Sequence, residues 1–322
     1  MSGRWARLAA GLLAGLVWAA SGAAAEGPNQ ARSSAKAAQT LLLDATRAGD
    51  RIVAVGAWGH VILSDDGGAS WRQARRVPTR AVLTSVHFVD DRLGWAAGHD
   101  AVVIHTGDGG ETWSLQHRDV ESDTPLFSVW MADARRGYAV GAFGLALATR
   151  DGGRHWAPVP ILPGEDDLHL NALFEGPGGT LFIAAEAGRV LRSTDGGTTW
   201  TALDPPYTGS FWGGLATPDA GVLVFGMRGH LLRSDDGGES WQSLDSGTDQ
   251  SLSGGTVLRD GRSVLVGLGG TVSQSRDAGR RFRAWTRTNR RGANAVLEGA
   301  AGLLVFGEGG VEALDPAADP AP

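Results

Sequence analysis

The chain has 322 residues, a formal net charge of −6 and a mean hydropathy of −0.10. It contains no cysteine, which excludes a disulfide framework, a thiol nucleophile and a cysteine-bound metal site. The acidic balance argues against nucleic acid as a general partner, and the length permits a core that is stable by packing alone.

The first 25 residues have the features of a secretory signal peptide. Arg4 and Arg7 precede an apolar run over residues 8–20, and small residues follow at Ala23 and Ala25. The pattern predicts cleavage after Ala25, because the apolar run is too short to span a bilayer. Cleavage removes two arginines and no acid, so the net charge changes from −6 to −8. We therefore expect a periplasmic or secreted protein with no transmembrane segment in the mature chain; an uncleaved N-terminal anchor is the alternative.

The mature chain divides into three segments. Residues 26–40 are polar and rich in small side chains, which predicts a flexible leader, and residues 315–322 (DPAADPAP) predict a disordered tail. Between them, residues 41–314 carry a repeated eight-residue box. Its six copies are SDDGGASW (64–71), TGDGGETW (106–113), TRDGGRHW (149–156), STDGGTTW (193–200), SDDGGESW (234–241) and SRDAGRRF (275–282).

The aromatic residues that close the boxes are 41 to 44 residues apart, and no helical periodicity lies between them. A period of this length is typical of propeller blades. A short run that is apolar at nearly every position, such as LFIAA (181–185), occurs seven times, which predicts a strand buried on both faces in each of seven blades. We therefore predict an all-β, seven-bladed β-propeller over residues 41–314, with four strands in each blade. The last blade ends after its third strand, so its fourth is either missing or donated by the leader.

Each box fits a structural role in a turn. Its aspartate can accept hydrogen bonds from the backbone of its own turn, its glycines permit the bend, and its aromatic residue can be buried. One fixed acid for each box does not provide the several oxygen ligands that calcium requires, so we predict no metal and no other cofactor. The predicted structural aspartates are Asp66, Asp108, Asp151, Asp195, Asp236 and Asp277.

The box pattern S/T-x-D-x-G-x-T-W resembles the Asp-box, or bacterial neuraminidase repeat, of sialidases, sortilins and related propellers. The longer unit LGWAAGHDAVVIHTGDGGETW (93–113) is more specifically similar to the photosystem II stability/assembly factor family, which also has secreted bacterial members. This resemblance implies a non-enzymatic protein that helps to assemble membrane complexes from the lumenal or periplasmic side. A monomer is expected, and the client is a membrane protein complex or an assembly intermediate, of which an exporter is one candidate.

A sialidase-like hydrolase or a lectin is the alternative on the same fold. Sialidases require three arginines, a tyrosine nucleophile with a glutamate partner, and an aspartate, and their N-terminal Arg-Ile-Pro-type motif is absent. Of the two tyrosines, Tyr138 occupies a strand slot filled elsewhere by Trp95 and Phe182, and Tyr207 lies on a connector. We therefore predict no catalytic residues.

Two connector segments are basic in this acidic chain. Residues 67–89 and 278–297 each contain several arginines, and the closed ring would bring both segments to one sector around blades 7 and 1. Arginine suits bidentate contact with carboxylate or phosphate, so this sector is the predicted partner-binding site. A solvated surface is the alternative. The residues assigned to the sector are Arg75, Arg76, Arg80, Arg287, Arg290 and Arg291.

The first strand of each blade contains small or polar residues, among them Ser85, Ser128, Asn171, Gly213 and Gly254. We expect these residues to face a crowded central axis, where a small-molecule pocket or a column of water would lie.

Overall fold

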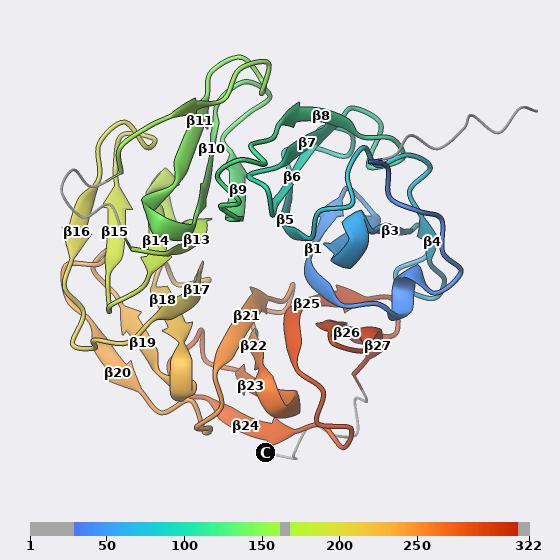
Figure 1. The fold of residues 1–322 in the computed structure, drawn as a ribbon. Coiled ribbons are helices and arrows are strands. Elements are labelled where there is room, and N and C mark those ends of the chain that lie inside the picture. The colour runs from blue at the N-terminus through green and yellow to red at the C-terminus, as the bar shows by residue number, and fades with distance from the viewer. Residues whose placement is uncertain (1–28, 162–167, 315–322) are drawn as a thin grey trace, which may run out of the picture.

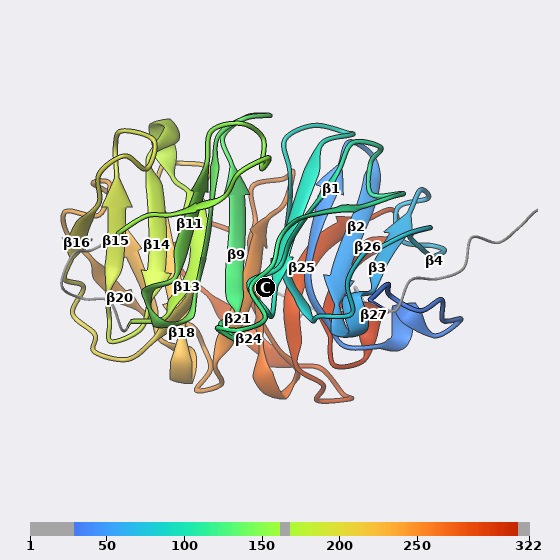
Figure 2. The same cartoon turned by 45° about the horizontal axis from the view of Figure 1, so that its top comes forward.

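Strands such as β2 (Arg51–Gly56) and β14 (Leu181–Ala185) contain almost no polar residue, so neither face can be left in water. The computed structural model, which describes residues 29–161 and 168–314, buries both faces by stacking seven antiparallel sheets in a ring around a central opening (Figures 1 and 2). The predicted all-β, seven-bladed propeller is confirmed. Within these residues, no helix has the length and apolar character needed to cross a membrane.

Six sheets contain four strands in chain order, and the seventh contains three. The strands of blades 1 to 3 are β1 (Leu42–Ala48), β2, β3 (Val61–Ser64), β4 (Arg72–Gln73), β5 (Leu83–Phe88), β6 (Gly94–Gly98), β7 (Val103–Thr106), β8 (Ser114–His117), β9 (Leu126–Met131), β10 (Gly137–Gly141), β11 (Ala146–Thr149) and β12 (Ala157–Pro158). Those of blades 4 and 5 are β13 (Leu170–Glu175), β14, β15 (Val190–Ser193), β16 (Thr201–Leu203), β17 (Phe211–Ala216), β18 (Val222–Gly226), β19 (Leu231–Ser234) and β20 (Gln242–Leu244). Those of blades 6 and 7 are β21 (Leu252–Val257), β22 (Ser263–Gly267), β23 (Thr271–Ser275), β24 (Arg283–Thr286), β25 (Ala293–Gly299), β26 (Gly302–Gly307) and β27 (Gly310–Ala313).

Single 3₁₀ turns interrupt several loops. They are η1 (Ala37–Gln39), η2 (Ala57–Gly59), η3 (Ala142–Gly144), η4 (Pro177–Gly179), η5 (Met227–Gly229) and η6 (Leu268–Gly270).

The ring closes between blades 7 and 1. The first strands of all seven blades contact one another around the axis, and β25 contacts β1. The described part of the leader, residues 29–40, adds no strand to blade 7. Instead, η1 lies against β27, with Ala37 only 3% exposed. The described part of the leader is also bonded to blade 1, since Ala31 N–H donates to Val77 O (3.0 Å) and Ser34 N–H to Gln73 Oε1 (2.9 Å). Residues 29–40 therefore cover the junction between the first and last blades.

The six boxes form closely similar turns. In box 2, Asp108 Oδ1 accepts from the Thr106 hydroxyl (2.8 Å) and from Thr112 N–H (2.9 Å), while Oδ2 accepts from the Thr112 hydroxyl (2.6 Å). The other five aspartates accept from the equivalent residues. These bonds stabilise the ionised carboxylate: those from the Ser70 hydroxyl and backbone N–H, for example, lower the pKa of Asp66 to about 2. The donors are thus supplied by the box itself.

Each box also joins its blade to the preceding one. The carbonyl oxygen of the residue after the box aspartate accepts a hydrogen bond from the blade before it in all six cases. The pairs are Ala300 N to Gly67 O, Arg51 Nη1 to Gly109 O, Gln116 Nε2 to Gly152 O, Tyr138 Oη to Gly196 O, Arg192 Nη1 to Gly237 O and Arg233 Nη1 to Ala278 O. The boxes therefore hold neighbouring blades together in addition to reversing the chain.

The small residues of the first strands lie between blades. A Cβ added at Gly254 would be 2.0 Å from Asn294 O in blade 7. Ser85 Oγ accepts from Val129 N–H of the next first strand (3.2 Å), and Asn171 Nδ2 donates to Phe211 O (2.8 Å). The close approach of neighbouring first strands around the axis therefore keeps these residues small.

Candidate functional site

The propeller has two faces with different chemistry. The boxes and the loops between the first and second strands lie on one face, which we call the box face. The hairpins between the second and third strands and the connectors between blades lie on the other, which we call the connector face and which is turned toward the viewer in Figure 1. The box face repeats the same turn six times, whereas the connector face differs from blade to blade. Specific recognition is therefore more readily built on the connector face.

Two of the six predicted arginines lie beside a box turn. The backbone N–H of Arg75 donates to Glu111 O (2.8 Å). Arg76 forms an isolated β-bridge with Thr112, and its carbonyl oxygen accepts from Trp113 N–H (2.9 Å). Arg75 Nε is also 3.5 Å from the Glu111 carboxylate. Arg75 and Arg76, which the sequence analysis placed in the connector-face sector, therefore lie next to box 2, because the chain after the short β4 runs alongside that box.

The other four arginines lie on two connectors of the connector face. Arg287 and Arg291 both pair with Glu312 on β27, and Arg287 is the more buried of the two. Arg80 Nε donates to Gln30 O (2.8 Å), and Arg80 remains exposed. Arg290 is exposed at the tip of its connector, where its φ is +54°. Of these four arginines, Arg80 and Arg290 are therefore the ones whose guanidinium groups form no ion pair in the described part of the chain.

Large apolar side chains are exposed on hairpins of the same face. Trp58 is 67% exposed, Phe143 is 63% exposed and Leu268 is 40% exposed. Trp58 and Phe143 have φ values of +63° and +52°, in the left-handed region that non-glycine residues seldom adopt. Gly269 occupies the equivalent position in η6, where no side chain resists this conformation. An exposed aromatic residue held in a strained conformation is a signal of function.

Trp58 lies beside one of the unpaired arginines. The hairpin η2 packs closely on the connector after β4, since a Cβ added at Gly59 would be 2.2 Å from Thr79 O and 3.2 Å from Arg80 Cα. Leu41, which is 37% exposed, accepts from Ala57 N–H of the same hairpin (2.9 Å). We call Leu41, Trp58 and Arg80 the Trp58 patch. It combines an aromatic anchor, an aliphatic neighbour and a cation on one surface.

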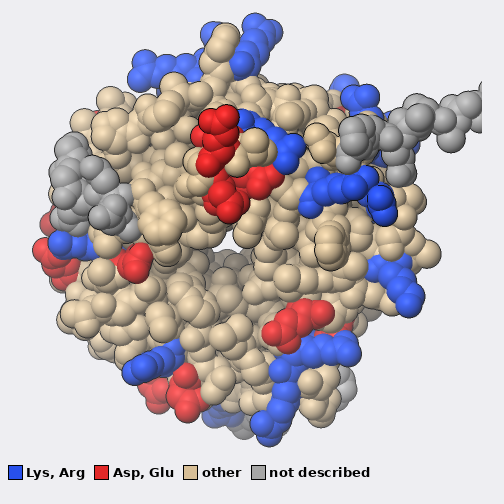
Figure 3. Space-filling view, in the orientation of Figure 1, with Lys and Arg blue, Asp and Glu red and all other residues tan. Residues whose placement is uncertain are grey.

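The charges of this face are spread around its rim. Figure 3, in the same orientation as Figure 1, shows basic groups at several points of the rim, with acidic groups among them and near the central opening. The connector between blades 2 and 3 contributes exposed acids at Asp119, Glu121 and Asp123. The predicted sector is therefore a set of separate cations, of which Arg80 and Arg290 on the connector face are exposed and form no ion pair in the described residues.

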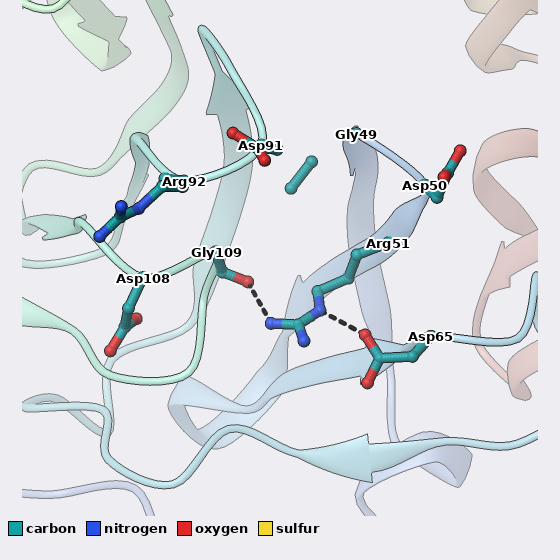
Figure 4. A pocket seen from close by; sticks show the side chains of 9 residues that line it. Gly49, Asp50, Arg51, Asp65, Asp91, Arg92, Asp108 and Gly109 are labelled. Atoms are coloured by element: carbon teal, nitrogen blue, oxygen red, sulfur yellow. Dashed lines mark hydrogen bonds and ion pairs between the residues drawn. The ribbon is translucent and has the colours of Figure 1, made fainter.

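The box face has a cavity of about 510 Å³ between blades 1 and 2 (Figure 4). Its Arg51, Asp65 and Asp108 side chains form contacts within the fold. Arg51 donates to Gly109 O (2.9 Å) and pairs with Asp65 and Glu111, while Asp108 is bonded inside its own box. Because Arg51 provides one of the six links between a box and the preceding blade, we assign this cluster to blade packing.

The two tyrosines lie on opposite faces. Tyr138 donates to Gly196 O (3.2 Å) in box 4 and packs edge-on against Trp200, with ring centroids 6.4 Å apart. Tyr207 lies on the connector between blades 4 and 5 and packs against His230, with ring centroids 4.1 Å apart. Neither tyrosine has a glutamate hydrogen-bond partner in the described residues. The three-arginine, tyrosine and glutamate arrangement of sialidases is therefore not assembled by these two side chains.

Trp58, Phe143 and Arg228 were not singled out by the sequence analysis. Their signal is present in the hairpin sequences GAWG, GAFG and GMRG, in which a large residue stands at a position that Gly269 fills in GLGG. All three residues have positive φ. The positive φ is unfavourable for these three large side chains, which makes them candidates for a functional role.

Comparison with known proteins agrees with the resemblance seen in the sequence. Residues 70–214 match the family model described as "Photosynthesis system II assembly factor YCF48". No curated protein matches the chain by sequence. A propeller resembling the photosystem II assembly factor family is therefore confirmed.

Solved structures with the same fold include both binding proteins and enzymes. "YCF48 bound to D1 peptide" superposes with a TM-score of 0.69 at 19% identity, covering 86% of this chain and 94% of that one. YCF48 from Cyanidioschyzon merolae gives a TM-score of 0.66 at 17% identity, covering 85% and 94%. "Streptogramin B lyase structure" gives a TM-score of 0.70 at 12% identity, covering 85% and 92%. At these identities the superpositions establish the fold alone.

Proposed function

We propose that the chain is a non-enzymatic interaction scaffold, or assembly factor, that docks on a membrane protein complex or an assembly intermediate. The observation that carries the proposal is the Trp58 patch, an exposed aromatic residue in a left-handed conformation beside Arg80. The match to the YCF48 family model and the similarity to a YCF48 structure with a bound D1 peptide support a protein ligand.

The chemistry of the patch suits a protein partner. Tryptophan and arginine are enriched at the residues that dominate binding energy, because they bury large areas and form directed polar contacts. A single exposed ion pair contributes at most about 1 kcal/mol, so the arginines alone would bind weakly. Burial of Trp58 beside Arg80 provides the apolar contribution that an all-basic surface lacks. The partner surface would pair an apolar side chain with an acidic one.

The proposed location is the periplasm or the exterior, after cleavage of the signal peptide at residues 1–25. These residues lie outside the part of the chain that the structure describes. The scaffold would act as a monomer and meet its client on the side of the membrane to which it is exported. An exporter is one such client.

Site-specific photo-crosslinking in the native host tests the proposal. A photoreactive phenylalanine analogue replaces Trp58 on the connector face or, as a matched control, Thr194, which is exposed on box 4. We expect a covalent adduct with an integral membrane protein from position 58 and none from position 194. The combined substitutions Arg80→Glu and Arg290→Glu should remove the adduct while leaving the melting temperature unchanged. Equal adducts from both positions, or no membrane protein at position 58, would contradict the proposal.

The hydrolase alternative has a separate test. The purified protein would have to release product from sialosides or aryl glycosides and lose that activity on Tyr207→Phe.

A further inference from the structure

A second candidate site lies on the connector face between blades 4 and 5, away from the Trp58 patch on blade 1. It is a cavity of about 650 Å³, which is within the range of small-ligand pockets, about 300–1,000 Å³. The connector before β17 and the hairpin between β18 and β19 form its walls. The lining residues are Pro206, Tyr207, Thr208, Gly209, Met227, Arg228 and His230.

The aromatic wall of this cavity is fixed by packing. The Tyr207 ring lies edge-on to His230, with centroids 4.1 Å apart, and is tilted against Phe211 at 5.2 Å. The Tyr207 hydroxyl donates to Met227 O (3.4 Å), which joins the connector to the hairpin. Pro206 and the Met227 side chain add apolar surface, and Thr208 adds a hydroxyl.

A single cation stands at the mouth of the cavity. Arg228 is exposed with φ at +55°, and its backbone N–H donates to Ser251 Oγ (3.1 Å), so the hairpin tip is held by the next connector. Within the described residues its guanidinium forms no ion pair. Asp249, on the same connector as Ser251, is exposed and accepts instead from Gln250 Nε2 (2.9 Å).

The charge of Arg228 acts on both rings of the wall. Burial, and then the nearby charge of Arg228, lower the pKa of His230 below 6.5, so the imidazole is neutral at pH 7. Burial raises the pKa of Tyr207, which the charge of Arg228 opposes, and the phenol also stays neutral. The cavity at neutral pH therefore has one positive charge beside an uncharged aromatic wall.

We propose that this cavity binds a carboxylate attached to an apolar group. Arg228 would hold the carboxylate, and Tyr207 and His230 would pack against the apolar group. A guanidinium binds a carboxylate through two parallel hydrogen bonds, which a neutral amide cannot reproduce. The ligand could be a free organic acid or an acidic residue of a peptide, and the inference does not rest on the proposed docking function.

NMR titration of the folded protein tests both sources. The first probe is 3-phenylpropionate, matched with 3-phenylpropionamide, which has the same apolar body without the charge. The second is the peptide acetyl-Leu-Glu-Leu-amide, matched with its Gln counterpart. We expect at least one acid to bind at least tenfold more tightly than its neutral partner. Binding of the free acid alone would assign a small-molecule ligand, and binding of the Glu peptide a protein segment.

Variants connect the binding to the cavity. Arg228→Gln should weaken binding of the acid at least tenfold, Arg228→Lys should restore part of the loss, and Arg80→Gln should leave it unchanged. The amide spectrum of each variant verifies the fold. Equal binding of acid and neutral partner, no binding of either acid, or unchanged binding by Arg228→Gln would overturn the proposal.

Discussion

Replacement of Arg233 by leucine should destabilise the propeller more than any change to an exposed arginine. Arg233 lies on β19 with its side chain 2% exposed. Its guanidinium donates to Asp219 Oδ1 (2.9 Å), Asp235 Oδ1 (2.5 Å) and Ala278 O (2.5 Å), the last of which belongs to box 6 in the next blade. Leucine would place an apolar side chain there, remove the charge and leave these acceptors without the donor that they share.

The expected loss of unfolding free energy depends on how far Arg233, Asp219 and Asp235 are buried. Breaking a fully buried ion pair costs about 3–5 kcal/mol, because the remaining charge is left unpaired in the interior. Asp219 and Asp235 are 32% and 52% exposed, so water can solvate them after the loss. We therefore expect about 2–4 kcal/mol for Arg233→Leu, measured by urea denaturation with tryptophan fluorescence.

Arg280 provides the matched control. It pairs with the same two carboxylates, at 2.7 Å from Asp219 and 3.3 Å from Asp235, but is 52% exposed. Arg280→Gln should cost less than about 1 kcal/mol, as exposed ion pairs do. Equal costs for the two variants would refute the assignment of the stabilisation to the buried guanidinium.

The same network predicts a dependence of stability on pH. Burial raises the pKa of Asp219, but hydrogen bonds from Thr217, Arg233 and Arg280 outweigh it and hold the pKa well below its usual range. A carboxyl whose pKa is lower in the folded state contributes stability above its unfolded pKa, and this stability is lost as the pH falls. The cost of Arg233→Leu should therefore be largest near neutral pH and shrink below about pH 4. A cost that does not change between pH 7 and pH 3 would contradict this account.

Three further predictions concern the boxes, the inner strands and catalysis. Asp108→Ala should lower the free energy of unfolding by about 1–3 kcal/mol and Trp113→Ala by about 3–5 kcal/mol in urea denaturation, without changing ligand binding by the folded fraction. Burial, opposed by hydrogen bonds from Val86 and Ala45 N–H, raises the pKa of Asp44 to about 6. As the pH rises from 4 to 7, the free energy of unfolding of the wild-type protein should therefore fall by up to about 3 kcal/mol relative to that of Asp44→Asn. The cause is that the Asp44 carboxyl releases its proton at a higher pH in the folded state than in the unfolded state. An equal difference between the two proteins at both pH values would exclude the raised pKa. The purified protein should release no product from sialosides or aryl glycosides, and turnover abolished by Tyr207→Phe would show the reverse.

The repeated pattern of the sequence determined the fold. A box recurring every 41 to 44 residues and seven runs of apolar residues require seven equivalent sheets, because each run must be buried on both faces. The local role of the box was also predictable, since Asp108 finds its donors within four residues along the chain. Interactions of such short range depend on the adjacent residues and little else.

The tertiary structure decided which charged and aromatic residues are available to a ligand. The arginine content of residues 67–89 and 278–297 suggested one basic sector, but Arg75 contacts Glu111 and Arg287 contacts Glu312, and these partners are distant in sequence. Trp58 lies beside Arg80 only because the hairpin of blade 1 packs on the connector that leaves it. Arg228 and Tyr207 share a cavity because the hairpin of blade 5 lies against the connector that enters this blade. Pairing and exposure are set by the packing of blades against hairpins and connectors, and a pattern in the sequence does not specify those contacts.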